Sequence, residues 1–253
     1  MRIAVAGGTG QAGRMVVEQA RAAGHDVVVI ARSAGVDLST GAGLDAALES
    51  VHTVIDVSNI QTISKTASVR FFETTTQNLL AAEQRCGVSH HVLLSIVGID
   101  QVNWGYYQGK RRQEELVLAG PVPATVLRST QFFEFTIQSL TAFPGPLAVV
   151  PWMRAQPVAA AEAATELVRL AEGPASGRVP ELAGPEVLVM SSAVRQVAKF
   201  RGPHKVVVSV PWPSAAGRPM ANRGLLPAAP GPRGTLRFAQ WLSETAQRPA
   251  PQR

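Results

Sequence analysis

The residues whose spacing points most directly to chemistry lie in the turn Gly7-Gly8-Thr9-Gly10-Gln11-Ala12-Gly13. The turn follows an apolar run at residues 2–6 and opens a helical pattern, and three of its glycines are spaced three residues apart. A pyrophosphate needs glycine there for close approach of the backbone, and a helix N-terminus offers it N–H groups and a positive dipole end. The pattern therefore predicts a dinucleotide site, with an ordinary glycine-rich turn as the alternative. The residues expected to bind the cofactor here are Gly7, Thr9, Gly10, Gln11, Ala12 and Gly13.

The end of the second predicted strand indicates which dinucleotide is bound. Strand Asp26–Ala31 is followed by Arg32, with no carboxylate where NAD-binding chains usually place one for the ribose 2′-hydroxyl. The planar guanidinium of Arg32 suits a 2′-phosphate, so we expect NADP(H) to be preferred over NAD(H) unless Arg32 is only a solvated side chain. Asp37 is a candidate for the adenine edge. The expected path of the cofactor then passes the end of the third strand, at Val57, Ser58 and Asn59.

These sites need strands and helices that alternate, and the sequence provides them. Short β-branched runs predict strands, longer amphipathic runs predict helices, and Gly87 stands where a helix C-cap is expected. The order favours an α/β fold, a doubly wound parallel sheet of Rossmann type with a small C-terminal substrate-binding region. We expect a cofactor domain at 1–150 and a smaller, partly interleaved region at 151–253. The clearest expected strands are 2–6, 26–31, 53–57, 91–95 and 124–127, and the clearest helices end near Ala23 or span 67–86, 105–119 and 159–171.

The pattern weakens beyond Phe143. Residues 186–190 and 205–210 resemble strands, residues 211–232 are rich in proline and glycine and predict a long loop, and 236–246 predicts a short helix. The same part of the chain holds the excess charge. Residues 201–253 contain eight basic residues and one acidic residue, whereas the first 200 residues contain 16 basic and 17 acidic ones. The sequence pI of about 10.2 thus describes the tail, and we interpret it as solvated surface and not as a nucleic-acid-binding face.

Composition excludes several classes of protein. Cys86 is the only cysteine among the 253 residues, so a disulfide framework and a cysteine-based zinc site are excluded. The five histidines do not fall at metal-ligand spacing, and no metal is expected. No apolar run approaches the roughly 20 residues that span a bilayer, and the N-terminal run is too short for a signal peptide. We expect a cytoplasmic protein.

With these motifs in hand, the sequence resembles the short-chain dehydrogenase/reductase superfamily, and most closely its atypical NmrA-like branch. The resemblance implies a Rossmann fold that binds NAD(P) at the carboxyl ends of the strands, with a small variable region over the substrate. One departure is that Ser129 follows Arg128, where many relatives have proline. The resemblance is carried by GGTGQAG at 7–13, LLSIVGID at 93–100, YYQGK at 106–110, LRSTQFFEF at 127–135 and ELAGPE at 181–186.

The resemblance also implies a catalytic set in which Tyr106 and Lys110 match the motif Y-x-x-x-K and Ser95 is the upstream serine. Spacing of four residues places Tyr106 and Lys110 on one face of a helix. A free phenol has a pKa of about 10, and we expect the ammonium and the oxidised nicotinamide to lower the pKa of Tyr106. Lys110 would also contact the cofactor, and Ser95 would hydrogen-bond the substrate oxygen. The alternatives are a solvated lysine on an amphipathic helix and a role for Tyr107, three residues before Lys110.

Aromatic residues near these positions suggest the substrate. Four of them, Trp104, Tyr107, Phe132 and Phe133, are expected to line an apolar pocket suited to a flat carbonyl compound such as a quinone, with core packing as the alternative. We expect Glu134 to face solvent. The leading hypothesis is an NADPH-dependent reductase of a small apolar or aromatic carbonyl compound or quinone, in which Tyr106 donates the proton.

Other functions remain open. The chain is alternatively a non-catalytic NADP(H)-binding redox sensor of the NmrA-like type, or an epimerase or dehydratase of nucleotide sugars, for which we interpret the substrate region as too short. The expected partner is a small molecule, with no nucleic acid and no membrane. The sequence leaves the oligomeric state open, a homodimer being one option.

Overall fold

The computed structural model describes residues 1–142, 144–201, 205–212 and 215–246. The chain forms two compact units: unit 1 is Met1–Arg128 with Ala161–Pro180, and unit 2 is Ser129–Ala160 with Glu181–Arg253. The chain therefore changes unit at three points, whereas we expected a boundary after residue 150 with partial interleaving of the two regions. The physical reason is that the segment 161–180 returns to unit 1 and adds a helix and an edge strand to its sheet.

Unit 1 is built on one six-stranded sheet with the strand order β2-β1-β3-β4-β5-β8. The strand β1 pairs in parallel with both β2 and β3, β3 pairs in parallel with β4, and β5 pairs in parallel with β8. The central strands are almost wholly buried, as expected for a parallel sheet covered on both faces. The strands are β1 (Arg2–Ala6), β2 (Asp26–Ile30), β3 (Thr53–Asp56), β4 (His90–Ile96), β5 (Ala124–Ser129) and β8 (Gly177–Arg178).

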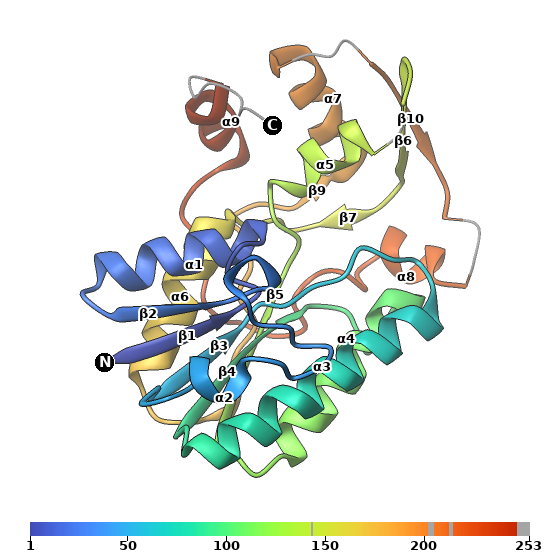
Figure 1. Cartoon of the computed structure of the whole chain (residues 1–253). Helices are drawn as coiled ribbons and strands as arrows, with labels where there is room; N and C mark the ends of the chain where they lie inside the picture. The colour runs from blue at the N-terminus through green and yellow to red at the C-terminus, as the bar shows by residue number, and fades with distance from the viewer. Residues whose placement is uncertain (143, 202–204, 213–214, 247–253) are drawn as a thin grey trace. The chain divides into compact units, whose positions relative to one another are not determined.

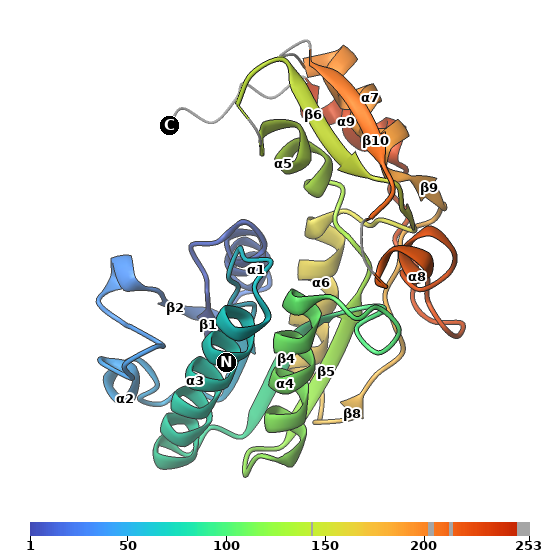
Figure 2. The same ribbon diagram turned by 90° about the vertical axis from the view of Figure 1, so that its right-hand side faces the viewer.

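Helices cover both faces of this sheet, so the prediction of a doubly wound Rossmann-type fold is confirmed. Helices α1 and α6 lie on one face, and α3 and α4 pack side by side on the other (Figures 1 and 2). The first five strands and the long helices end within two residues of where the sequence places them, and Gly87 caps α3 with a φ of +70°. The helices are α1 (Gln11–Ala22), α2 (Leu44–Ala47), α3 (Lys65–Cys86), α4 (Gly105–Ala119) and α6 (Ala160–Glu172).

Unit 2 differs more from the sequence prediction. Residues 186–190 form only the two-residue strand β9, and Met190 already begins the helix α7, which was not predicted. The expected loop at 211–232 contains the short helix α8. Two parallel strands, β6 and β10, form one ladder, and β7 pairs antiparallel with β9. The elements are α5 (Phe135–Thr141), β6 (Leu147–Pro151), β7 (Arg154–Ala155), β9 (Leu188–Val189), α7 (Met190–Arg201), β10 (Val206–Val210), α8 (Gly217–Ala221) and α9 (Phe238–Ala246).

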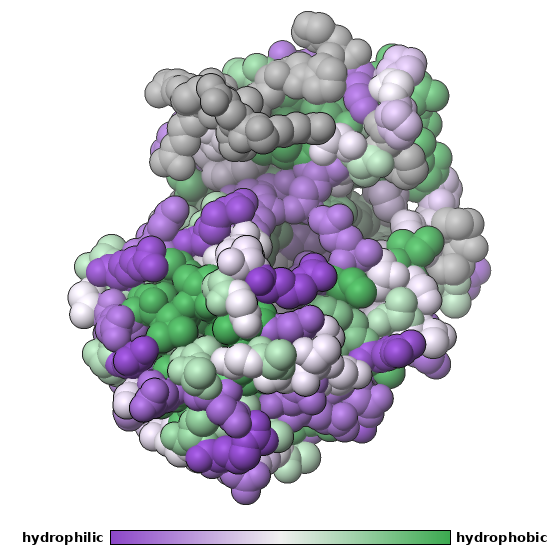
Figure 3. Space-filling model, in the orientation of Figure 1, coloured by the Kyte–Doolittle hydropathy of each residue, from purple (hydrophilic) through white to green (hydrophobic). Residues whose placement is uncertain are grey.

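The ladder of β6 and β10 has one buried and one outward face. Ala148 and Val150 point into the core of unit 2 and are fully buried. On the outward face, Leu147 stands opposite Val206 and Val149 stands opposite Val208, and these four side chains are exposed. Apolar surface is accordingly visible over β6 and β10, whereas hydrophilic and hydrophobic residues are interspersed on the visible face of unit 1 (Figure 3). Phe143 and two of the basic tail residues, Arg248 and Arg253, lie outside the described residues. In the part of the chain that is described, no helix is both long and apolar enough to cross a membrane.

A buried ion-pair cluster fixes the end of β5 in unit 1. Glu114 on α4 is fully buried, and the guanidinium of Arg128 donates to both of its carboxylate oxygens at 2.8 and 2.7 Å. Arg128 also donates to Asp100 at 2.6 Å, and Arg178 on β8 donates to Glu114 at 3.2 Å. The cluster joins the loop after β4 to α4, β5 and β8. Removing one partner of a buried pair is costly because it leaves the other charge uncompensated.

We expect Arg128→Ala to lower the free energy of unfolding by on the order of 3 kcal/mol, because Glu114 remains buried with Arg178 alone. Arg112→Ala is the matched control, since Arg112 pairs with Glu73 and Glu115 at a half-exposed site where water screens the pair more than at Glu114. Urea unfolding followed by circular dichroism measures both. Equal losses for the two variants would contradict a structural role of the buried cluster.

Candidate functional site

The glycine turn after β1 lies directly against the loop after β3. Gly7 has a φ of +79°, and a Cβ atom built there would approach the Cα of Ser58 to 2.9 Å. A Cβ atom on Gly13 would come within 2.1 Å of the carbonyl oxygen of Gly7. The turn is closed by a hydrogen bond of 2.9 Å from the N–H of Gly10 to that same oxygen. Glycine is therefore required at Gly7 for conformation and at Gly13 for contact between helix and strand.

The N-terminus of α1 follows this turn without a side-chain cap. Gly10 occupies the N-cap position and has no side chain to accept from the first turn, which begins at Gln11 and Ala12. The first N–H groups of a helix have no acceptor within the helix itself, and together with the helix dipole they favour an anion. Arg14 donates to the carbonyl of Thr9 at 2.9 Å and so brings a cation to the turn. The residues present thus fit the pyrophosphate of a dinucleotide.

The end of β2 brings Arg32 and Asp37 near each other. Arg32 is exposed and begins the short 3-10 turn Arg32–Ala34. Asp37 accepts hydrogen bonds from the hydroxyl and the backbone N–H of Ser39, and these bonds lower the pKa of its carboxyl group, to which the nearby charge of Arg32 also contributes. Asp37 is therefore a carboxylate that can accept hydrogen bonds, and Arg32 is an exposed cation beside it. Contact of Asp37 and Arg32 with a bound nucleotide stays a prediction.

Two buried serines lie at the carboxyl ends of neighbouring strands. Asp56 of β3 stands in register with Leu93 of β4, so Ser58 and Ser95 each lie two residues beyond that pair. Both side chains are buried, and neither hydroxyl oxygen has a hydrogen-bond partner. Val57, which precedes Ser58, is also buried and donates its N–H to Ala6 of β1. Buried hydroxyl groups without partners are uncommon and mark this edge of the sheet as a place where a ligand would supply one.

Tyr106 lies on the first turn of α4 and points its hydroxyl at the loop after β3. The hydroxyl donates to Oδ1 of Asn59 at 2.7 Å. The ring is packed among Phe72, Trp104 and Tyr107, with centroid distances of 5.9, 5.6 and 6.0 Å. Burial raises the pKa of Tyr106 above the ordinary value of a phenol, and neighbouring Tyr107 raises it further. The expectation that Lys110 lowers this pKa is wrong for the chain by itself.

Lys110 explains why. Its Nζ donates to the carbonyl oxygen of Leu94 at 2.7 Å and to Oε1 of Gln113 at 2.6 Å, and it lies 4.9 Å from the centre of the Phe72 ring. The side chain is 3% exposed, and burial lowers its pKa to about 8 against the opposing charges of Asp56 and Glu114. Tyr106 and Lys110 share the helix α4, but the ammonium is directed into the sheet and not at the phenol.

Two residues that the sequence prediction did not include, Asp56 and Gln113, connect this cluster. Gln113 donates from Nε2 to Oδ2 of Asp56 at 2.8 Å, and Oδ1 of Asp56 accepts from the N–H of Ser58 at 2.8 Å. Asn59, expected on the cofactor path, is the partner of Tyr106. The available signals were the carboxylate that ends the buried strand β3 and the glutamine three residues after Lys110, on the same helical face. The glycine turn, the loop after β3 and α4 thus form one continuous site within unit 1.

The four expected pocket residues fall in two units. Trp104 and Tyr107 belong to unit 1, and their ring centroids are 5.2 Å apart. Tyr107 is buried. Phe132 and Phe133 belong to unit 2. Phe133 is fully buried, with ring centroids 5.4 Å from both Phe238 and Trp241, so this residue packs in the core of unit 2 and does not line a pocket as expected.

Glu134 was expected to face solvent, and that expectation is wrong. Its side chain is buried, and Oε2 accepts from the N–H of Ala160 at 3.3 Å. Burial raises the pKa of its carboxyl group, which hydrogen bonds from the backbone and from Trp241 oppose. Glu134 therefore serves the packing of unit 2. The local sequence pattern does not reveal this, because a carboxylate among phenylalanines fits either environment.

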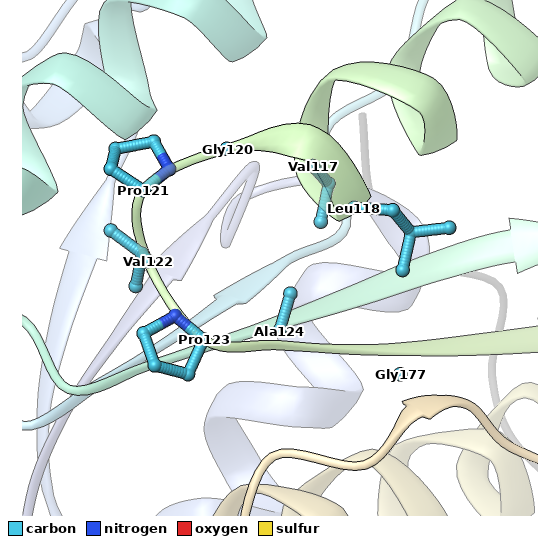
Figure 4. Close-up of a pocket in the computed structure, with 8 residues that line it drawn as sticks. All are labelled: Val117, Leu118, Gly120, Pro121, Val122, Pro123, Ala124 and Gly177. Carbon is cyan, nitrogen blue, oxygen red and sulfur yellow. The ribbon is translucent and has the colours of Figure 1, made fainter.

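The hollow in Figure 4 lies away from these residues. It has a volume of about 350 Å³ and is lined by the turn between α4 and β5, including Gly120 and Pro123, and by Gly177 of β8. This turn precedes β5, whereas the glycine turn follows β1. In a parallel sheet the amino ends of the strands lie opposite their carboxyl ends. The hollow is at the amino end of β5 and is therefore not part of the candidate site.

No protein-family model matches the chain, and no curated protein matches its sequence. Its fold, however, is similar to several solved structures. An NADPH-dependent quinone oxidoreductase from Escherichia coli matches with a TM-score of 0.69 and 18% identity over 96% of this chain and 99% of that one. The triphenylmethane reductase of Citrobacter sp., in complex with NADP(H), matches with a TM-score of 0.63 and 19% identity over 84% and 79%.

A UDP-glucose-4-epimerase from Stenotrophomonas maltophila with bound NAD matches with a TM-score of 0.73 and 13% identity over 98% of this chain and 97% of that one. Together these likenesses establish a Rossmann-type fold. The epimerase matches over nearly its full length, so the expected short substrate region does not exclude a nucleotide-sugar enzyme.

The burial of Lys110 predicts a pH-dependent stability. Its pKa is about 8 in the folded chain against 10.5 for an unperturbed lysine, so between these values the unfolded chain binds a proton that the folded chain does not. Raising the pH through this window therefore stabilises the native chain relative to Lys110→Met, by roughly 2–3 kcal/mol in total. Urea unfolding at pH 7.5, 9 and 10 measures the difference, with the exposed Lys65→Met as control. A difference that stays constant with pH would contradict the buried ammonium.

Proposed function

We propose that the chain is an NAD(P)-dependent oxidoreductase of the short-chain dehydrogenase/reductase superfamily, in its NmrA-like branch, that reduces a small apolar or aromatic carbonyl compound or a quinone. The observation that carries the proposal is the continuity of the site. Gly7 abuts Ser58, and the next residue, Asn59, holds the hydroxyl of Tyr106. A phosphate-binding turn and a proton donor therefore share one edge of one sheet. Two proteins of similar fold, an NADPH-dependent quinone oxidoreductase and a triphenylmethane reductase in complex with NADP(H), support the same proposal.

The cofactor would be held by the glycine turn. Backbone N–H groups at the start of α1 would bind the pyrophosphate, and the absence of a Cβ atom at Gly10 would let it approach. Asp37 would accept from the adenine edge, and Arg32 would pair with a 2′-phosphate, which favours NADP(H). Val57 and Ser58 would lie along the path toward the nicotinamide. A bound reduced nicotinamide supplies the hydride.

The chain's own residues would handle the substrate oxygen and the proton. The hydroxyl of Ser95, which has no partner, would donate to the carbonyl oxygen and orient it. Tyr106 would donate its proton to the same oxygen as negative charge develops there. Lys110 would act as a positioning residue, because its ammonium donates to Gln113 of α4 and to the carbonyl oxygen of Leu94, which precedes Ser95 on β4.

One observation favours a second function, a NADP(H)-binding redox sensor without turnover. The ammonium of Lys110 is buried and makes no hydrogen bond to Tyr106, so the phenol lacks the activation that the catalytic motif would provide. Consumption of NADPH with a panel of quinones and aldehydes separates the two functions. Adding UDP-glucose as a separate arm tests for epimerisation, in which the sugar is converted without net consumption of cofactor.

We expect Tyr106→Phe to reduce kcat by at least about 100-fold in the reaction found with this panel, since general acid catalysis typically contributes 10²–10⁴. The Kd for NADPH should be unchanged, because the phenol donates to Asn59 and not to the glycine turn. Tyr107→Phe should keep most of the turnover. If both variants are as active as the native chain, Tyr106 is not the proton donor.

The choice of cofactor is tested at Arg32. We expect Arg32→Ala to weaken NADPH binding at least about tenfold and to leave NADH binding within about twofold, because a charge-assisted bond to the 2′-phosphate would be lost. Arg14→Ala, which alters a cation at the turn itself, should affect both cofactors alike. Fluorescence titration of the reduced cofactors gives both Kd values. An equal loss for NADPH and NADH in Arg32→Ala would contradict the assignment.

A further inference from the structure

The side chain of Asn59 holds the Tyr106 hydroxyl in a single orientation. Its Oδ1 accepts the backbone N–H of Ile60 at 2.8 Å and the hydroxyl of Tyr106 at 2.7 Å. A backbone N–H can only donate, so the amide atom that faces Ile60 must be the oxygen and not the nitrogen. That oxygen can only accept, so Tyr106 must present its proton to it. The geometry thus requires a neutral phenol acting as donor.

The start of the loop that carries Asn59 is held by buried hydrogen bonds. The carboxylate of Asp56 accepts from the N–H of Ser58 at 2.8 Å and from Gln113 at 2.8 Å, and Gln113 accepts from Lys110 at 2.6 Å. Asp56, Gln113 and Lys110 are all nearly or wholly buried. Asn59 itself is exposed, but the start of the loop that carries it is set by this buried network.

We propose that Asn59 is a positioning residue that keeps Tyr106 protonated and thereby sets this site to deliver a proton, that is, to reduce a carbonyl group and not to oxidise an alcohol. The inference rests on the proposed oxidoreductase function and deepens it. Oxidation of an alcohol would need Tyr106 as a phenolate base. A phenolate oxygen placed at 2.7 Å from the carbonyl oxygen of Asn59 would lose its hydrogen bond and face a second partial negative charge.

The groups around Tyr106 do not oppose this effect. Tyr107 beside it raises the pKa of Tyr106, as burial does. Lys110, one turn along α4, directs its charge at Leu94 and Gln113. On α3, which packs against α4, Phe72 faces the ring. Two charged residues of α3 lie against α4: Lys65, whose backbone lies against Gly105 and whose side chain is exposed, and Glu73, which is paired with Arg112 at 2.7 Å. None of these charges is among the causes that shift the pKa of Tyr106.

The proton balance follows. Tyr106 leaves Asn59 and donates its proton to the substrate oxygen, while the carbonyl carbon takes the hydride, with its two electrons, from the reduced nicotinamide. The C=O π bond would become a C–H bond and an O–H bond, with a bound reduced nicotinamide as the two-electron donor. The phenolate then takes a proton from solvent and returns to Asn59. Asn59 itself neither gains nor loses a proton.

The chain has two tyrosines, Tyr106 and Tyr107, so in a Tyr107→Phe background the ultraviolet absorbance of phenolate reports Tyr106 alone. In this background we expect Tyr106 to ionise at lower pH in Asn59→Ala than in the parent. The variant should contain roughly three- to tenfold more phenolate at a given pH, because one neutral hydrogen bond to the phenol is lost. In Asn59→Asp, Tyr106 should ionise at higher pH than in the parent, because a carboxylate accepts the phenol's hydrogen bond more strongly and repels the phenolate.

Asn103→Ala is the matched control, because Asn103 accepts from Gln108 at an exposed site and not from Tyr106. Circular dichroism at each pH confines the comparison to folded protein. The proposal is overturned if Asn59→Ala shows no more phenolate than the parent at every pH at which both are folded, or if the alanine and aspartate variants shift in the same direction. If one Asn59 variant does not fold, the other still decides the outcome.

The titration needs neither cofactor nor substrate, so its failure is distinct from failure of the proposed function. If the pH at which Tyr106 ionises shifts in opposite directions in the two variants but no carbonyl reduction is found, the proposed oxidoreductase function is wrong and the effect of Asn59 on Tyr106 still stands. Where reduction is measured, the alkaline limb of the kcat profile should move to lower pH in Asn59→Ala and to higher pH in Asn59→Asp. A merely structural role would lower kcat without moving that limb.

Discussion

The carboxylate of Asp56 is buried at the end of β3, and a buried carboxylate must have both oxygens hydrogen-bonded. One oxygen accepts from the N–H of Ser58 and the other from Gln113, which in turn accepts from Lys110. This requirement determines where the loop after β3 begins. Ser58 then lies against Gly7, and Asn59 meets Tyr106. The turn that would bind phosphates and the residue that would donate a proton are thus positioned by one buried polar network.

Burial outweighs direct charge attraction at this site. Tyr106 and Lys110 are four residues apart on one helix, a spacing that suggests an ammonium beside a phenol. In the structure the phenol is surrounded by aromatic rings and the ammonium is bound within the sheet, so desolvation is the largest influence on both. The pKa of Tyr106 is raised and that of Lys110 is lowered to about 8. Both shifts favour the neutral forms, and a neutral phenol is the form that a reductase needs.

The sequence predicts the parts of this site that depend on local geometry. Gly7, Gly10 and Gly13 are recognisable because close backbone approach allows only glycine, and α4 spans Gly105–Ala119 as its amphipathic pattern indicates. The direction of the Lys110 side chain is not local, because it depends on Leu94 and on a glutamine whose partner, Asp56, lies 57 residues away along the chain. For the same reason Phe133 and Glu134 could not be assigned. Their environments are set by Trp241 and Ala160, which the pattern around them does not reveal.

In the proposed function, the glycine turn and Tyr106 serve one bound nicotinamide cofactor. A crystal structure of the chain with NADPH tests this most directly. It should show the pyrophosphate at the N-terminus of α1. The nicotinamide C4 should lie where the carbon of a substrate carbonyl group could be about 3–3.5 Å from C4 while the oxygen of that group is about 3–3.5 Å from the Tyr106 hydroxyl. A nicotinamide turned away from Tyr106, or a pyrophosphate bound away from the glycine turn, would contradict the account.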